Sequence, residues 1–340
     1  MGRARDIPVI RASIFEPVLV AARKIGVPLE RYLRLAGLPT TPCEEPDRIL
    51  PEIPTWRFVN SVAQTQGIMT LGIFSLDIIR MFELSSLKPL IAGSKNLNEL
   101  LQHMCIAAPL MSNSASYRLE ILGDLAVFSN RGLRLMSDDT QAQLFQIFGM
   151  IQLIQLAAGP DWRPEVIHFT IPRSAEIERA PQLNPSRIRF SQRVPGIAFS
   201  RYLLPSAVHL PNSKQSDVSP IPATFSEQLQ QVLAPYMGET SFDKAFAAEI
   251  AGMSPRTLQR RLDEEHTSFV AVLERLRLQK AQALLEDPDV KLIEIAFELG
   301  YENPPSFTRA FRRWTGVTPS EYRHRLLIRP PTAANAALRR

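Results

Sequence analysis

The chain has few of the residues and motifs that disulfide-rich proteins, metalloproteins and many enzymes require. It contains only two cysteines, Cys43 and Cys105, in 340 residues. These are too few for a disulfide framework and favour a reducing compartment. Its five histidines are scattered, and none has a partner at metal-ligand spacing. The sequence also lacks a phosphate loop, a dinucleotide fingerprint and a nucleophile elbow. We therefore expect a protein that is not an enzyme, with no cofactor and no metal.

Uninterrupted hydrophobic segments are also scarce. The most apolar helix that the pattern predicts, near 144–158, is interrupted by Gln146, Gln152 and Gln155. This composition indicates a buried or interface helix rather than a membrane span. The first residues are charged and lead into only a short apolar stretch, unlike a secretory signal peptide. We expect a soluble, cytoplasmic protein that does not associate with a membrane.

Charge of one sign is not in large excess either. The chain carries 39 basic and 34 acidic residues, a formal net charge of +5. From Phe225 onward there are 16 Lys and Arg against 15 Asp and Glu, which leaves +1. Bulk charge therefore does not identify a nucleic-acid partner. Attraction to phosphates would have to come from a local stripe of arginines.

Length and composition predict two domains. Residues 209–224 are rich in proline, serine and polar residues, which is typical of a linker. Residues 1–208 mix helical and strand patterns and predict an α+β domain. Residues 225–327 predict an all-α domain, and the Pro/Ala-rich end, 328–340, is expected to be disordered.

Local signals place the elements of the first domain. Gly37 and Gly67 are expected to end helices, and Asn96 to cap one. Gly123 and Asp124 lie between two alternating segments, which predicts a hairpin. Helices are expected at about 14–25, 28–36, 54–66, 97–107 and 138–158. Strands are expected at 116–122, 125–130, 166–171, 187–191 and 197–199.

A loose internal repeat marks the end of the chain. Each copy has a small residue four positions before a glycine, followed by two apolar residues four positions apart. These residues are Ala248, Gly252, Leu258 and Leu262 in the first copy, and Ala296, Gly300, Phe307 and Phe311 in the second. Each copy predicts two short helices joined by a tight turn, the helix-turn-helix that places its second helix in the DNA major groove. We expect these motifs at 242–262 and 292–314.

The first copy shows why these residue types recur. Gly252 suits the left-handed backbone of the turn. Ser254 is a natural N-cap, and Pro255 fits the first helical position, where a missing N–H costs nothing. Leu258 and Leu262 lie four residues apart and are expected to face the core.

Polar side chains remain for the outer faces of the two second helices. Arginine and glutamine can bind guanine and adenine edges. The candidate DNA-binding residues are Arg256, Thr257, Gln259, Arg260 and Arg261 in the first copy, and Ser306, Thr308, Arg309, Arg312 and Arg313 in the second. Between them, 268–285 predicts an amphipathic helix of roughly 25 Å, suited to spacing two recognition helices along one DNA face. Arg275, Arg277 and Lys280 on it are expected to be solvated or to contact phosphate at most.

The segment 225–327 resembles the DNA-binding domain of the AraC/XylS family of transcription regulators. The stretches AAEIAGMSPRTLQRRL (247–262) and IAFELGYENPPSFTRAFRRWTGVTPSEYR (295–323) carry the resemblance. It implies promoter DNA and RNA polymerase as partners, and activation of transcription. It implies base contacts for Arg256, Gln259, Arg260, Ser306 and Arg309, with Thr308 and Arg312 nearer the phosphates.

One residue departs from that family pattern. Members usually carry serine or another polar residue where this chain has Pro305. Because proline offers neither an N–H nor a polar side chain, we expect the second recognition helix to contact DNA less. Most of the sequence specificity should then come from the first.

The first domain resembles, more loosely, the regulatory half of the branch that controls ornithine use and virulence genes. Its carrying segments are 18–39, 97–110 and 187–208. This resemblance implies a small-molecule effector of unknown identity, a homodimer, or both, and no arabinose-type sugar site is recognisable. Two alternatives stay open: a DNA-binding regulator whose first domain only dimerises, and an enzyme fused to a DNA-targeting domain.

Overall fold

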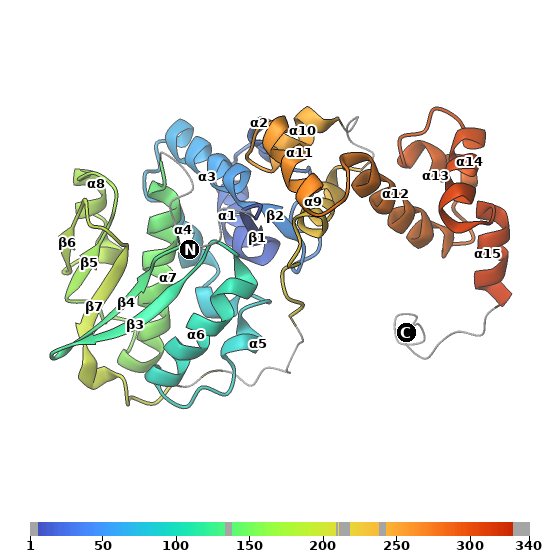
Figure 1. The fold of residues 1–340 in the computed structure, drawn as a ribbon. Helices are drawn as coiled ribbons and strands as arrows, with labels where there is room; N and C mark the ends of the chain where they lie inside the picture. Colours follow the sequence, from blue (N-terminus) through green and yellow to red (C-terminus); the bar gives the residue numbers. More distant parts are fainter. Residues whose placement is uncertain (1–5, 133–137, 209, 211–217, 238–242, 329–340) are drawn as a thin grey trace. The chain divides into compact units, whose positions relative to one another are not determined.

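A computed structural model describes residues 6–132, 138–208, 210, 218–237 and 243–328. The chain forms two compact units, and it passes from the first to the second between Ala223 and Thr224. Figure 1 shows mixed helices and strands in the first unit and helices in the second. Half of the predicted linker and most of the predicted tail lie outside the described residues, although the last helix includes Ile328.

The first unit contains two sheets. Strands β1 (Val9–Arg11) and β2 (Ile49–Pro51) form an antiparallel pair. The larger sheet has the order β3-β4-β7-β5-β6, in which only β5 and β6 pair in parallel. Its strands are β3 (Tyr117–Leu122), β4 (Leu125–Asn130), β5 (Val166–His168), β6 (Arg187–Arg189) and β7 (Gly196–Ser200).

Helices cover these sheets and supply most of the core. They are α1 (Ala12–Lys24), α2 (Leu29–Ala36), α3 (Glu52–Gln66), α4 (Leu71–Ile78), α5 (Lys88–Ile91), α6 (Leu97–Met111), α7 (Thr140–Ala158) and α8 (Ala175–Glu178). Short 3-10 turns lie at η1 (Met81–Glu83), η2 (Pro181–Leu183) and η3 (Arg201–Leu203). The α+β prediction for this domain is confirmed.

The hairpin of β3 and β4 follows from its turn. Leu122 pairs with Leu125, so two residues close the loop, and Gly123 has a φ of +62°. Glycine adopts such a φ without the steric cost that a Cβ brings. Ala126 and Phe128 alternate inward along β4 and are fully buried. The predicted hairpin is confirmed, with β3 beginning one residue later than expected.

Helix α7 is the centre of the first unit. It is buried on nearly every turn, including Gln141 and Gln152. Gln141 donates to the Met69 carbonyl at 2.8 Å and accepts from the Gly72 amide at 2.9 Å. Gln152 binds η1 and α4 in the same way, through Met81 N and Leu76 O at 2.9 Å each. Gln152, one of the glutamines that distinguish this helix from a membrane span, is thus hydrogen-bonded inside the core, and Gln141 is held in the same way.

Helix ends in the first unit largely follow their local signals. Gly37 and Gly67 end α2 and α3 in the left-handed conformation, and Asn96 caps α6 by accepting from the Glu99 amide at 2.9 Å. Strands β5 and β6 are shorter than the predicted 166–171 and 187–191. The chain leaves β5 before Pro172, and β6 ends before Ser191, whose φ is +56°.

The second unit is built from helices throughout its described residues. They are α9 (Phe225–Leu233), α10 (Lys244–Ile250), α11 (Pro255–Glu264), α12 (Phe269–Leu285), α13 (Leu292–Glu298), α14 (Pro304–Thr315) and α15 (Pro319–Ile328), with a 3-10 turn η4 (Ala234–Tyr236) after α9. The Glu265 carboxylate, just after α11, accepts from the Phe225 and Ser226 amides at 2.6 and 3.0 Å. This carboxylate caps α9 and joins it to the first helix-turn-helix.

Candidate nucleic-acid interface and the N-terminal cavity

The start of α11 is fixed by three neighbouring residues. Gly252 has a φ of +68° in the turn after α10. The Ser254 hydroxyl accepts from the Thr257 amide at 3.2 Å, and Pro255 occupies the first helical turn. The predicted turn, cap and proline entry of the first helix-turn-helix are confirmed. Helix α10 is described from Lys244, so the first predicted residue of the motif, Phe242, lies outside the described residues.

The start of α14 uses the same devices with other residues. Gly300 has a φ of +77°, and the Asn303 side chain accepts from the Ser306 amide at 3.0 Å. Pro304 and Pro305 occupy the first turn, where amide hydrogens have no partner within the helix. Sequence analysis missed the cap. An asparagine directly before a proline that opens a helix is the signal that would have found it.

Apolar anchors decide which faces of α11 and α14 point outward. Leu258 and Leu262 have no exposed surface, and neither do Phe307 and Phe311. The two phenylalanine rings lie 5.7 Å apart edge to face, and Phe311 meets Tyr322 of α15 at 5.4 Å. Their predicted core role is confirmed.

Three arginines stand out on the outer faces. Arg256 is exposed, and Arg260 has 64% of its side chain in solvent, with only a 3.8 Å approach to Glu264. On α14, Arg309 is exposed and donates to the Ser306 hydroxyl at 3.1 Å. An open hollow of about 640 Å³ lies along α11. Its lining residues are Lys244, Pro255, Arg256, Thr257, Gln259, Arg260 and Asp263.

Both the oxygen and the nitrogen of the Gln259 side-chain amide already form hydrogen bonds within the protein. Its Nε2 donates to Asp263 Oδ1 at 2.8 Å, and its Oε1 accepts from Lys244 Nζ at 2.6 Å. Adenine offers an acceptor and a donor in this same pattern. A base contact by Gln259 therefore exchanges intramolecular hydrogen bonds for intermolecular ones.

Two of the predicted contact residues, Arg261 and Arg313, differ from the rest in burial or in pairing. The Arg261 side chain is only 11% exposed, and its Nη1 lies 3.6 Å from Glu264 Oε2. This burial is at odds with a DNA contact, because Arg261 lies about 100° around the helix from Arg260 and turns toward the protein. Arg313 is 65% exposed but pairs with Glu274 of α12.

The remaining predicted residues sit at the edges of these faces. Thr257 is half-buried, and its hydroxyl lies 2.9 Å from that of Ser254. On α14, Ser306 and Thr308 are half-buried and Arg312 is exposed. The structure thus places nine of the ten predicted side chains on the accessible sides of α11 and α14.

The basic residues of α12 mostly have structural partners. The Arg277 guanidinium lies 5.2 Å from the Tyr301 ring centroid and donates to the Leu299 carbonyl. Lys280 binds Glu298 at 2.9 Å. The expectation that these two side chains are simply solvated is wrong, because they fasten α13 and the turn after it to α12. Arg275 is exposed, as expected.

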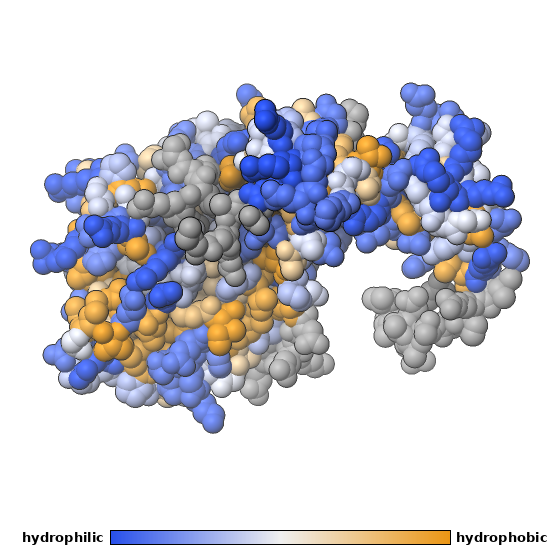
Figure 2. Space-filling model, viewed as in Figure 1, coloured by the Kyte–Doolittle hydropathy of each residue, from blue (hydrophilic) through white to orange (hydrophobic). Residues whose placement is uncertain are grey.

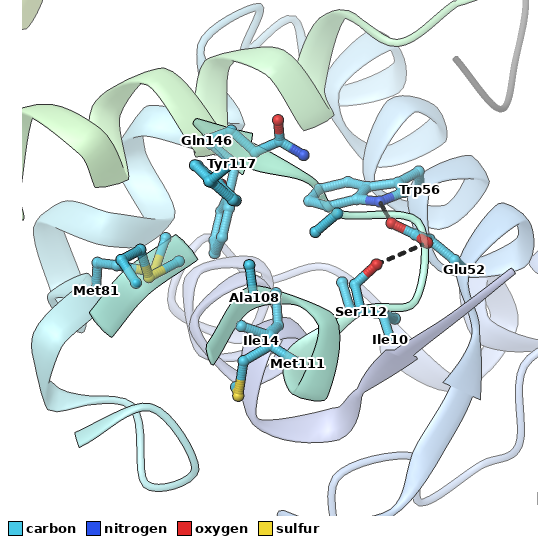
Figure 3. A pocket seen from close by; sticks show the side chains of 13 residues that line it. Ile10, Ile14, Glu52, Trp56, Met81, Ala108, Met111, Ser112, Tyr117 and Gln146 are labelled. Carbon is cyan, nitrogen blue, oxygen red and sulfur yellow. Dashed lines mark hydrogen bonds between the residues drawn. The ribbon is translucent and has the colours of Figure 1, made fainter. Parts of the chain in front are cut away.

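A second candidate site lies within the first unit. A narrow cavity of about 40 Å³ is lined by residues of α1, α3, α6, α7, β1, β3 and η1 (Figure 3). Its wall is mainly apolar and aromatic. Glu52, at the start of α3, is the one acid among the described residues that line it.

Glu52 is a buried carboxylate with an unusual setting. It is 1% exposed, and its Oε2 accepts from the hydroxyls of Ser114 at 2.6 Å and Ser112 at 3.1 Å. Trp56 Nε1 lies 3.4 Å from the other oxygen (Figure 3). Burial raises the pKa of Glu52 from its ordinary value of 4.5 to about 7, since the loss of hydration outweighs these hydrogen bonds. Sequence analysis missed Glu52, because an acid in a first helical turn is normally exposed.

Two family signatures together cover most of the chain. A helix-turn-helix domain matches residues 247–325. The family described as the arabinose-binding domain of AraC transcription regulators, N-terminal, matches residues 26–228, more than half of the chain. The chain belongs to the AraC family of transcription regulators. This family is one of DNA-binding transcription regulators, not of enzymes, and the predicted pairing of an α+β domain with a double helix-turn-helix domain is confirmed.

Individual relatives of this AraC-family chain match over shorter stretches. The HTH-type transcriptional regulator VirS of Mycobacterium tuberculosis is 35% identical over 109 residues, 32% of each chain. The ornithine utilization regulator of Pseudomonas aeruginosa is 40% identical over 77 residues, 23% of each chain. The crystal structure of the transcriptional regulator CdpR from Pseudomonas aeruginosa aligns with 87% of this chain and 96% of its own, at 18% identity and a TM-score of 0.37.

Within the described residues of this AraC-family chain, no helix is both long enough and apolar enough to cross a membrane.

Proposed function

We propose that this AraC-family protein is an effector-responsive activator that reads promoter DNA through α11 and α14. The observation that carries the proposal is the pair of outward arginine faces held by equivalent caps and apolar anchors. Each recognition helix presents its N-terminal half, the part that reaches base edges in helix-turn-helix complexes.

Roles within the interface follow from exposure and chemistry. Arg256, Gln259 and Arg260 are proposed to contact bases from α11, and Ser306 and Arg309 from α14. Thr257, Thr308, Arg312 and Arg313 are proposed to contact phosphates, which position the helices without reading sequence. We leave Arg261 out of the contact set because its side chain is largely buried.

The sharpest test of the DNA-binding surface is Arg260→Ala. Selection of binding sites from genomic fragments with the full chain should recover two short sequence blocks about one DNA turn apart. On that site, Arg260→Ala should weaken binding by about 1–3 kcal/mol and relax the preference at one base position. Arg34→Ala, an equally charged and exposed control on α2, should leave binding unchanged. Equal weakening on every sequence would make Arg260 a phosphate contact instead.

The first domain is proposed to sense a small molecule and to pair two subunits. Binding would shift the population between states with different DNA affinity, which requires that the effector itself bind those states with different affinity. The apolar cavity beside Glu52 favours an effector over a domain that only dimerises. Recruitment of RNA polymerase is proposed from the family resemblance.

An apolar face of the first unit suits the pairing of subunits. Figure 2 shows apolar residues gathered over β3, β4 and α6. On these elements, Ile106 of α6 is 72% exposed and Ile121 and Leu122 of β3 are 48% and 63% exposed, and β3 is an edge strand. Large exposed apolar patches mark interaction sites. Ile106→Asp should convert a dimer to a monomer in sedimentation velocity, and an unchanged sedimentation coefficient would place the interface elsewhere.

A further inference from the structure

We propose that the cavity beside Glu52 is the effector site and that it accepts a small, mainly apolar molecule carrying one cationic amine. The inference rests on the proposed function, because it names the chemical class of the effector. The site is formed within the first unit and is separate from the DNA-binding helices.

Glu52 has hydrogen-bonding capacity that its protein partners do not use. An ionised carboxylate has about four acceptor positions on its two oxygens. Oε2 accepts from two serine hydroxyls, whereas Oε1 has one long contact, 3.4 Å from Trp56 Nε1. Oε1 can therefore accept another strong donor. An ammonium group supplies both the donor and the compensating charge that a buried carboxylate requires.

Aromatic side chains form part of the cavity wall beside Glu52. Trp56, Tyr117 and Phe145 line the same cavity as Glu52. The Trp56 and Phe145 ring centroids lie 5.7 Å apart at an interplanar angle of 64°, so their faces point in different directions. Aromatic faces attract cations, and tryptophan does so most strongly. A carboxylate flanked by aromatic rings is suited to an amine.

The charge of the surrounding residues also favours a cationic ligand. Among the described lining residues there is no lysine, arginine or histidine, so Glu52 has no cation of its own in the cavity. Gln146 uses its amide oxygen to accept from Asn130 at 3.0 Å, which leaves its amide nitrogen as the group that would favour an anion. A carboxylate ligand is therefore the rival that the experiment must separate.

The size of the cavity limits the ligand. About 40 Å³ corresponds to roughly three water molecules. Met81, Met104 and Met111 line it, and methionine side chains repack readily around a guest. An aliphatic chain of about four carbons is the largest guest that modest repacking accommodates.

Three probes of equal length test the inference on the full chain: n-butylamine, n-butanol and butyrate. Thermal unfolding should shift upward with butylamine, since only the folded state holds the ligand. Butylamine should bind about tenfold or more tightly than butanol, as expected for a hydrogen bond to a charged group. Equal binding of the three probes, or tighter binding of butyrate, overturns the proposal.

Variants locate the site. Glu52→Gln should abolish the preference for butylamine over butanol, whereas Glu176→Gln, an exposed control on α8, should keep it. Ala108→Leu fills the cavity from α6 without removing the carboxylate and should weaken all three probes. Butylamine binding that survives both Glu52→Gln and Ala108→Leu overturns the proposal. If Glu52→Gln fails to fold, the ranking of the probes and Ala108→Leu decide.

Operator binding separates this inference from the proposed function. Selective DNA binding with no amine binding refutes the amine site and leaves the regulator intact. Amine binding without selective DNA binding refutes the proposed function instead. Amine binding that leaves operator affinity unchanged shows a site that is not the effector site, which also overturns the inference.

Discussion

Glu52→Gln should change how the stability of the first unit depends on pH. Burial raises the pKa of Glu52 from 4.5 to about 7, so between these values the folded protein holds a proton that the unfolded chain has released. The stability contributed by protonated Glu52 is therefore complete below about pH 4.5 and declines as the pH rises. The loss is complete once the pH exceeds about 7.

The size of this loss follows from the same two pKa values. The two pKa values span 2.5 pH units, from 4.5 to about 7, and each unit corresponds to about 1.4 kcal/mol. The loss of stability is therefore roughly 3 kcal/mol. Glutamine has a similar shape and does not titrate. The stability of the variant minus that of the wild type should therefore rise by about 3 kcal/mol between pH 4.5 and pH 8, while titrations common to both chains cancel in the difference.

Urea unfolding followed by tryptophan fluorescence can measure this difference. The chain has three tryptophans, and Trp314→Phe in both proteins leaves Trp56 and Trp162 as reporters, both in the first unit. Glu176→Gln serves as the exposed control and should follow the wild type at every pH. Parallel curves for wild type and Glu52→Gln would refute the reasoning. They would mean that Ser112, Ser114 and Trp56 stabilise the ionised form enough to cancel the effect of burial.

Two further predictions concern the recognition helices. Ser254→Ala removes the cap of α11 and should lower the unfolding free energy of the second unit by about 1 kcal/mol. Thermal unfolding measures this change. An unchanged midpoint of thermal unfolding would show that Pro255 alone organises the helix start. Pro305→Ser should preserve or strengthen operator binding in a titration, because it adds a polar group at the start of α14. A clear loss of affinity would instead assign the proline a part in forming that start.

The helix-turn-helix units could be placed from sequence because their signals are local. Gly252, Ser254 and Pro255 each fix a backbone conformation within a few residues, and the structure shows all three in the predicted positions. Burial of Leu258 and Phe311 followed from four-residue spacing alone. The family resemblance, which rests on these same residues, was reliable for the same reason.

The features that the sequence did not predict concern how far individual side chains are buried and which distant residues they contact. Arg260 and Arg261 are adjacent in sequence and both approach Glu264, yet the Arg260 side chain is 64% exposed and that of Arg261 only 11%. Arg277 contacts the Tyr301 ring. The setting of Glu52 depends on serines that lie 60 and 62 residues further along the chain. No local pattern encodes such pairings.

The hydrogen bonds that Gln259 forms with Lys244 and Asp263 affect how the DNA preference of such a regulator can change during evolution. The base that Gln259 prefers depends on the energy of the bonds it gives up, and those bonds belong to two neighbouring side chains. Replacing either neighbour would change the competition among bases without altering any atom that touches them. Operator preference in a duplicated copy of this protein can thus drift through Lys244 of α10 or Asp263 near the end of α11, while Gln259 and the other proposed base contacts keep their identity.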